Sequence, residues 1–205
     1  MKNPSQCGIR ADAGGGELIA ASGVTHTLAI PLRGGHIVKR GAGTLVFTND
    51  LSVAMVSNQP EYSPLASSTV KVANTGGLEI AEGTIRCVAG TTDAASRFSG
   101  VGTLSGEFGA FTLAVEPGAT DALTFADLTA TRVTVDFGRP AGEPIRVRDM
   151  PETVVAKVAT EAAFRAISWK GVNCGDGIVS EFRYDSAAGV VRARFRSTGV
   201  VIILR

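Results

Sequence analysis

Short stretches in which apolar and polar residues alternate dominate the chain. Alternation over three to seven residues, bounded by Gly, Asn, Asp or Pro, is typical of half-buried β-strands. A turn at Pro117-Gly118 has the residues that favour tight reversals. The pattern predicts an all-β protein with strands at residues 44–48, 68–72, 77–80, 84–88, 111–115 and 131–137.

A three-residue step recurs among these strands. Gly-Thr followed by Leu or Ile occurs at residues 43–45, 83–85 and 102–104, which are 40 and 19 residues apart. A Leu-Thr step at Leu123 and Thr27-Leu28 upstream extend the series, so a unit of about 20 residues is indicated. A repeat of this length is typical of a solenoid, in which a coil buries its apolar face against its neighbours. Glycine is expected at the corners, because a positive φ costs glycine nothing.

The last third of the chain has a different pattern. Residues 151–168 leave helix and strand open, because Pro151-Glu152 favours a helix start whereas Val154, Val155 and Val158 favour a strand. Strands are expected at 166–169, 178–184, 190–195 and 200–204, with a hairpin loop at 185–189. We therefore expect residues 1–138 to form the solenoid. Residues 139–205 would form an antiparallel β cap that hides an open sheet edge.

Three segments resemble a known repeat. Residues 39–47, Lys-Arg-Gly-Ala-Gly-Thr-Leu-Val-Phe, resemble the opening of the passenger-associated repeat of bacterial autotransporters, and residues 77–85 resemble its closing half. Residues 99–106 resemble a glycine-rich step found later in such passengers, although Asn49 and Tyr62 are more widely separated than in the repeat. The resemblance covers residues 34–138. It implies a right-handed parallel β-helix that is exported and displayed on a cell surface.

The ends of the chain depart from that family. Residues 1–7 have no apolar core of a signal peptide, and no motif of a membrane barrel is recognisable near the C-terminus. No run of 18 apolar residues occurs, so no membrane-spanning helix is expected. An extracellular or cell-surface location then requires that a signal was removed or lies outside this chain.

Composition and charge narrow the classes of partner. Glycine contributes 25 of 205 residues, charged residues make up 19%, and the net charge is +1, so nucleic acid is not an expected partner. Residues 139–205 carry 11 basic and 7 acidic side chains, whereas residues 1–138 carry 9 and 12. Arg192, Arg194 and Arg196 alternate and would line one face of a strand. They either bind an anionic partner or form a solvated strand face.

The side chains that usually catalyse reactions are few. His26 and His36 are the only histidines, no Gly-x-Ser-x-Gly elbow accompanies them, and no carboxylate stands at ligand spacing. Cys7, Cys87 and Cys174 contain no Cys-x-x-Cys pair, so free, buried thiols are expected. No catalytic, metal-binding or cofactor-binding residue is assigned.

Three loops have superficial likenesses to ligand-binding motifs. Residues 14–16, Gly-Gly-Gly, lack the Lys-Ser/Thr of a phosphate loop, and residues 100–106 are out of register for a dinucleotide fingerprint. Residues 173–177 lack the alternating acidic residues of a calcium loop. All three are interpreted as turns.

Enzymes that cleave polysaccharides place carboxylates in a groove. The acidic residues of the first region are scattered along the sequence, and Trp169 is interpreted as a core residue of the cap, with stacking on a sugar as the alternative. The carboxylates considered are Asp12, Glu17, Glu79, Glu82, Asp93 and Glu116.

The sequence therefore predicts a non-catalytic structural or adhesive module of an exported bacterial surface protein, with cell-surface glycans or proteins as partners. Two alternatives remain open. One is a β-helix that binds or cleaves carbohydrate, and the other is a filament subunit that assembles through the ends of the solenoid.

Overall fold

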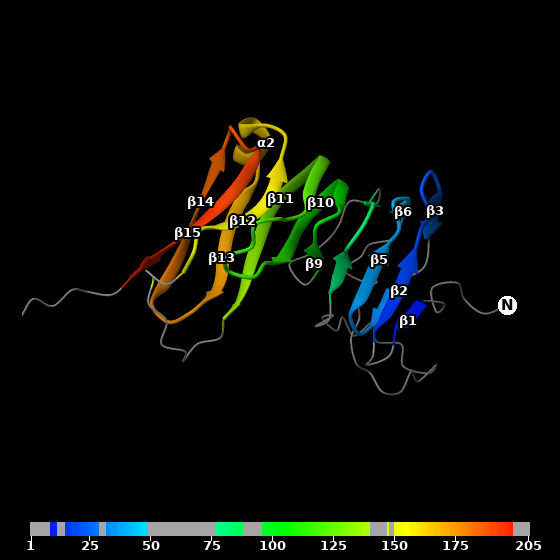
Figure 1. The fold of residues 1–205 in the computed structure, drawn as a ribbon, viewed down its shortest axis with the longest axis horizontal. Coiled ribbons are helices and arrows are strands. Elements are labelled where there is room, and N and C mark those ends of the chain that lie inside the picture. The colour runs from blue at the N-terminus through cyan, green and yellow to red at the C-terminus, as the bar shows by residue number, and fades with distance from the viewer. Residues whose placement is uncertain are drawn as a thin grey trace, which may run out of the picture.

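Strands make up most of the computed structural model, which describes residues 9–11, 15–28, 32–48, 77–87, 96–139, 147 and 150–198. Figure 1 shows them side by side along the longest axis, with the one short helix of the described residues, α2 (Glu161–Arg165), above the C-terminal strands. The all-β class is confirmed. The strands are β1 (Ile9–Ala11), β2 (Gly16–Ile19), β3 (Thr25–Leu28), β4 (Leu32–Gly34), β5 (Ile37–Arg40), β6 (Thr44–Phe47), β7 (Leu78–Ile80), β8 (Thr84–Cys87), β9 (Arg97–Gly100), β10 (Thr103–Ala114), β11 (Thr124–Arg139), β12 (Thr153–Val158), β13 (Ser168–Cys174), β14 (Ile178–Asp185) and β15 (Val190–Ser197).

Thirteen of the described strands form one open, mostly parallel sheet. Row one runs through β2, β5, β7, β9, the later parts of β10 and β11, and β13. Row two runs through β3, β6, β8, the earlier parts of β10 and β11, and β12. The remaining two strands, β1 and β4, pair with each other in parallel. The long strands β10 and β11 therefore join the two rows.

The Gly-Thr-(Leu/Ile) steps lie directly beside one another in row two. Five threonines form one column of the register: Thr25, Thr44, Thr84, Thr103 and Thr124. Successive members are 19, 40, 19 and 21 residues apart, which matches the unit of about 20 residues.

Two anchors of the predicted repeat were displaced by two residues. Thr44 pairs with Thr25 rather than Thr27, and Leu104 pairs with Phe125 rather than Leu123. The loops that precede these strands differ in length, so a dipeptide match upstream or downstream does not by itself determine the pairing.

Alternation within each strand divides buried from solvent-facing residues. In row two the column after the threonines is Leu45, Ile85, Leu104, Phe125 and Val158, and all five are buried. In row one a second buried column contains Ile37, Leu78, Phe98, Leu113 and Val135. Because side chains on a strand alternate between faces, the two columns meet in one core.

One lysine lies inside this core. Lys39 of β5 is fully buried, and its Nζ donates hydrogen bonds to the carbonyl oxygens of Gly41 and Gly43, at 2.7 Å from the latter. Burial lowers the pKa of Lys39, while the nearby Glu82 carboxylate raises it. Gly83 of the next coil lies against the same corner, with a φ of 67°. A Cβ at Gly83 would collide with the Lys39 Nζ and with both carbonyl oxygens.

Residues 151–168 contain both of the elements that were left open. Residues 153–158 form β12, where Val155 and Ala156 are buried, so the strand preference of the β-branched residues prevails there. The helix begins only after Thr160, whose side-chain oxygen accepts a hydrogen bond from the Ala163 N–H at 3.1 Å. Pro151 therefore precedes the strand and does not start a helix.

The antiparallel hairpin is confirmed. Strands β14 and β15 pair antiparallel, and β15 also pairs antiparallel with β12. The loop closes with a hydrogen bond from the Gly189 N–H to the Asp185 carbonyl at 2.9 Å, and Gly189 has a φ of 65°. The predicted strand at 166–169 begins at Ser168 and continues to Cys174. The predicted strands at 68–72 and 200–204 lie outside the described residues.

Trp169 is a core residue, as interpreted. Its ring packs against Phe125, Phe164 and Phe182, with centroids 6.2, 5.9 and 5.9 Å away. Its Nε1 donates a hydrogen bond to the Phe164 carbonyl oxygen at 3.1 Å. Both the apolar ring and the polar N–H are therefore engaged inside the C-terminal region.

The corner around Lys39 predicts a specific loss of stability. Gly83→Ala should lower the free energy of unfolding by at least about 3 kcal/mol, because a positive φ and a backbone collision act together. Gly23→Ala is the matched control, since Gly23 has a φ of 75° and open space around it, and should cost only about 1 kcal/mol. Urea unfolding followed by circular dichroism measures both. Equal losses in the two variants would contradict the close packing at this corner.

Candidate functional site

The two histidines lie in different rows. His26 is exposed on β3, where it occupies the column that Leu45 and Ile85 fill farther along the stack. His36 precedes β5, and its Nε2 lies 2.8 Å from the Glu79 carboxylate. Within the described residues, no group of three His, Cys, Asp or Glu side chains is placed to hold a metal ion.

The scattered carboxylates make separate contacts. Glu17 accepts a hydrogen bond from Arg40 Nε at 2.8 Å, and Glu82 accepts one from the Gly41 N–H at 2.9 Å. Glu116 lies in the turn before residue 119, where its carbonyl accepts the Ala119 N–H. Asp12 and Asp93 lie outside the described residues. The contacts of Glu17, Glu79 and Glu82 link neighbouring strands or corners.

The glycine-rich loops that the structure describes are turns. Residues 101–102 connect β9 to β10, and a strand follows them rather than a helix. Residues 175–177 reverse the chain between β13 and β14. Residue 14 of the glycine triplet lies outside the described residues.

Two cysteines are free and buried, as predicted. Cys87 ends β8, and burial raises the pKa of its thiol to about 12. Burial also raises the pKa of Cys174 at the end of β13, beside the Ser180 hydroxyl. Since the thiolate is the reactive form, neither environment favours a nucleophile. Cys7 lies outside the described residues.

An aspartate joins three strands of row one. Asp136 on β11 accepts hydrogen bonds from Arg97 on β9 at 2.5 Å and from Asn173 on β13 at 2.8 Å. The Gly138 N–H is a third donor, at 2.9 Å. Burial by itself would raise the pKa of Asp136, but these donors outweigh it and hold the pKa below its ordinary value.

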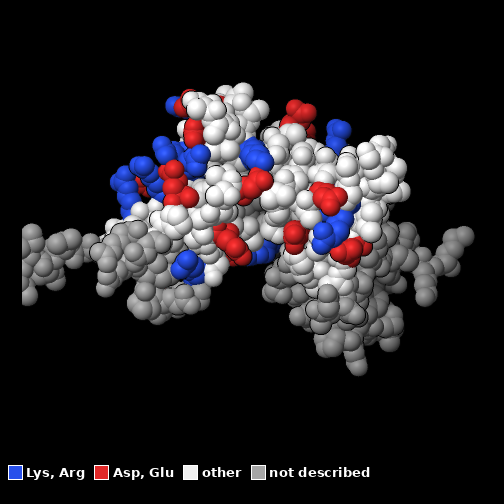
Figure 2. All heavy atoms as spheres, in the orientation of Figure 1, with Lys and Arg blue, Asp and Glu red and all other residues white. Residues whose placement is uncertain are grey.

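The densest group of charges lies on the C-terminal hairpin. We call it the arginine face: Arg183, Arg192, Arg194 and Arg196 together with Glu152, Glu181 and Asp185. Figure 2 shows basic side chains gathered at the C-terminal side of the molecule, over β14 and β15 in Figure 1, with acidic ones between them. Alternation on β15 places Arg192, Arg194 and Arg196 on the face opposite to the buried Val191 and Ala193.

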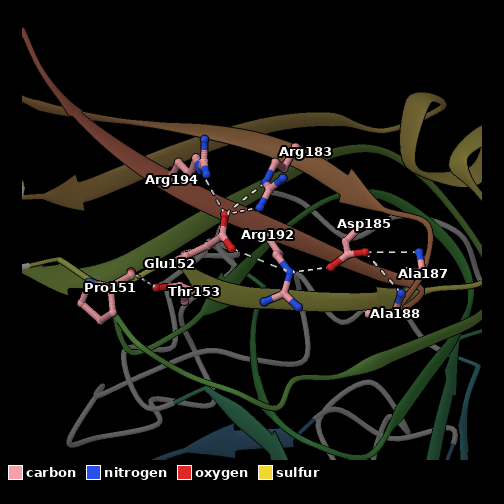
Figure 3. A network of polar contacts seen from close by, with 9 residues as sticks. All are labelled: Pro151, Glu152, Thr153, Arg183, Asp185, Ala187, Ala188, Arg192 and Arg194. Carbon is pink, nitrogen blue, oxygen red and sulfur yellow. Dashed lines mark hydrogen bonds and ion pairs between the residues drawn. The ribbon is translucent and has the colours of Figure 1, made fainter.

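Glu152 is the centre of this face (Figure 3). Its Oε1 accepts hydrogen bonds from Arg183 Nε and Nη2 at 3.0 and 2.7 Å and from Arg194 Nε at 3.1 Å. Arg192 Nε lies 3.9 Å from the other carboxylate oxygen and donates to Asp185 Oδ2 at 2.9 Å. Although desolvation raises the pKa of Glu152, the arginine contacts lower it overall. Asp185 has a lowered pKa chiefly through its hydrogen bond from Arg192.

The remaining pair completes the face. Arg196 Nη2 lies 2.9 Å from Glu181 Oε2 on the neighbouring strand. The side chains of Arg194 and Arg196 are 61% and 65% exposed. Both therefore combine an anchoring contact with an accessible guanidinium group.

A cavity of about 420 Å³ lies between β13 and β14. Its lining includes Arg139, Lys170, Asn173 and Ser180. Arg139 Nε and Ser180 Oγ are buried there without a hydrogen-bond partner. The cavity is polar and can accommodate water or a small polar molecule.

The alternating arginines of β15 were anticipated, but Arg183 and Glu152 were not. The predicted loop at 185–189 implies that Arg183 lies opposite Arg192, and the register confirms that pairing. Glu152 reaches the face from the start of β12, 31 residues before Arg183, and no local pattern marks it.

Comparison with known proteins identifies no relative. No family model, no curated protein and no solved structure matches the chain. Among the described residues, no helix is long and apolar enough to cross a membrane.

The buried thiols predict slow chemical labelling. In a Cys7→Ser variant at pH 8, Cys87 should react with Ellman's reagent roughly a hundredfold or more slowly than a free thiol, because little thiolate exists at a pKa of about 12. The same variant in guanidinium chloride should label both remaining thiols quickly. Rapid labelling of two thiols in the folded protein would contradict the burial of Cys87 and Cys174.

The Asp136 contacts predict an acid-dependent stability. A pKa below the ordinary value of 3.8 means that the stabilisation is fully present above about pH 4 and is lost as the pH falls through the folded-state value. Asp136→Asn should therefore destabilise the protein by about 1–2 kcal/mol at pH 6 and by much less near pH 2.

Urea unfolding at both pH values measures the effect. Asp127→Asn on the same strand is the control for a charge change on β11. A difference between wild type and Asp136→Asn that does not shrink at low pH would show that the ionised carboxylate is not responsible.

Proposed function

We propose that the chain is a non-catalytic β-solenoid module of an exported surface protein, and that it presents binding surfaces on a rigid scaffold. The observation that carries the proposal is the threonine column of row two, in which one solvent-facing residue recurs at the same register position on five strands. In this proposal β1 and β4, row one and row two are three sides of a right-handed parallel β-helix, and β14 and β15 cap its end.

Rigidity follows from the pairing. Neighbouring strands in a sheet lie about 4.8 Å apart, so each coil adds that length to the stack and repeats its outward side chains at that interval. The buried columns fill the interior between the rows. A stack of this kind positions surface groups without a cofactor or a moving part. The contacts of Glu17, Glu79 and Glu82 across coils support structural roles for carboxylates that a polysaccharide-cleaving β-helix would use for catalysis.

A second candidate function is self-assembly through the N-terminal end. Strands β2 and β3 each pair with one neighbour in the described sheet, so one edge of each has no paired strand there. Ile19 on β2 and Val24 before β3 are exposed apolar side chains at this end, at 66% and 37%. A second copy that paired with this edge would cover them.

The display function predicts accessibility from outside the cell. An epitope-tagged chain in its native host should be labelled by antibody on intact cells or recovered from the medium, with a cytosolic enzyme as the control for lysis. Retention of the tagged protein with that enzyme would overturn the proposal. Release of reducing sugar from any acidic polysaccharide, abolished in Glu79→Gln, would favour the carbohydrate-cleaving alternative.

Self-assembly predicts an effect of charge at the N-terminal end. If copies associate there, light scattering of the wild type should grow with concentration, and Ile19→Lys should abolish that growth. Val101→Lys is the matched control, because Val101 is also exposed, at 48%, but lies between β9 and β10. A monomer at every concentration, or equal behaviour of both variants, would exclude assembly through this edge.

A further inference from the structure

We infer that the arginine face binds a linear glycan whose carboxylate or sulfate groups repeat along the polymer. The inference supplies a partner class for the proposed display function and rests on it. It is carried by the number, placement and exposure of the guanidinium groups on β14 and β15.

The face has more cations than its own carboxylates can balance. Four guanidinium groups surround three carboxylates, which leaves one positive charge in excess. Arg183 and Arg192 are directly opposite in the antiparallel register, and like charges so placed repel each other. Glu152 and Asp185 offset that repulsion, and Glu181 is engaged with Arg196. An external anion would supply the missing negative charge.

The carboxylates also hold the arginines in an oriented state. Arg183 and Arg194 reach the same Glu152 oxygen from two sides (Figure 3), so both guanidinium groups are fixed at their inner ends. A guanidinium has five N–H donors, and Arg194 uses its Nε for Glu152. With 61% and 65% of their side chains exposed, Arg194 and Arg196 are accessible to a ligand. Because they are already ordered, less conformational entropy is lost when an anion binds.

The spacing favours a polymer over a single anion. Arg192, Arg194 and Arg196 stand at alternate positions of one strand, which puts neighbours about 7 Å apart and the outer two about 14 Å apart. One carboxylate or sulfate group contacts one guanidinium in the usual paired geometry. A chain with anionic groups at successive sugar units can contact two or three of them together.

The residues between the arginines favour a glycan over a nucleic acid. Sugar rings carry hydroxyl donors, and Glu152 and Glu181 offer carboxylate acceptors within the face. Single-stranded nucleic acid binds where aromatic rings stack on bases. On these two strands the aromatic residues Phe182, Tyr184 and Phe195 are buried or packed against the core, on the opposite side from the arginines.

The test compares two charge-matched double variants of the full chain. Binding of fluorescent heparin and hyaluronan in 50 mM NaCl is measured by anisotropy for wild type, Arg194→Gln/Arg196→Gln and Arg40→Gln/Arg165→Gln. Arg40 and Arg165 are exposed arginines paired with Glu17 and Glu161 away from the arginine face. We expect the first variant to weaken binding about tenfold and the second less than about twofold, with both effects reduced at high salt.

A third variant separates recognition from folding. Glu152→Gln raises the excess charge of the face, so it should bind heparin at least as tightly as the wild type even if it is less stable. Circular dichroism verifies that each variant is folded. Loss of binding in Glu152→Gln while it remains folded would overturn the oriented-arginine arrangement.

Other outcomes overturn the partner class. Tighter binding of a single-stranded oligonucleotide or of phosphatidylserine vesicles than of either glycan would exclude a glycan as the preferred partner. Equal weakening by both double variants would exclude the arginine face. Absence of glycan binding by a chain that is displayed on intact cells would reject this inference and leave the display function in place.

Discussion

The in-register pairing of parallel strands is the constraint on which the rest of the structure depends. Thr44, Thr84 and Thr103 lie beside one another, and so Leu45, Ile85 and Leu104 lie beside one another on the buried side. Because side chains alternate, a slip of one residue would bring the threonines into the core and expose the apolar column. The core, the corner at Lys39 and the solvent-facing columns therefore all follow from one choice of register.

The C-terminal region solves a different problem with the same backbone. A stack of parallel strands ends in an unpaired edge, and here β12 is covered by β15, which pairs with β14. The inward side of this hairpin contributes Val191, Ala193 and Phe195 to the core. Its outward side is free to carry charge. The positions of the arginines are thus determined by apolar packing on the other side of the same strands.

The sequence indicated this arrangement wherever a local signal set the geometry. Gly-Thr-(Leu/Ile) steps predicted the pairing of row two, and the loop at 185–189 predicted the hairpin, since both depend on a few adjacent residues. Row one has no such motif, and its pairing follows from the length of the corners. Glu152 was missed because its contact with Arg183 depends on the antiparallel pairing of β12 with β15, which no short pattern encodes. Residues 151–168 were ambiguous because a strand and a short helix share the segment.

The doubled interval between β6 and β8 shows how such a chain can change length. The two strands are direct neighbours, yet Thr44 and Thr84 are separated by 40 residues, about twice the usual step. The extra residues leave the pairing on either side unaltered, because each coil contacts only the coils next to it. Insertions at that connection are therefore compatible with the stack. In evolution or in design, a new loop or a grafted peptide at this site would add function while the scaffold keeps its register.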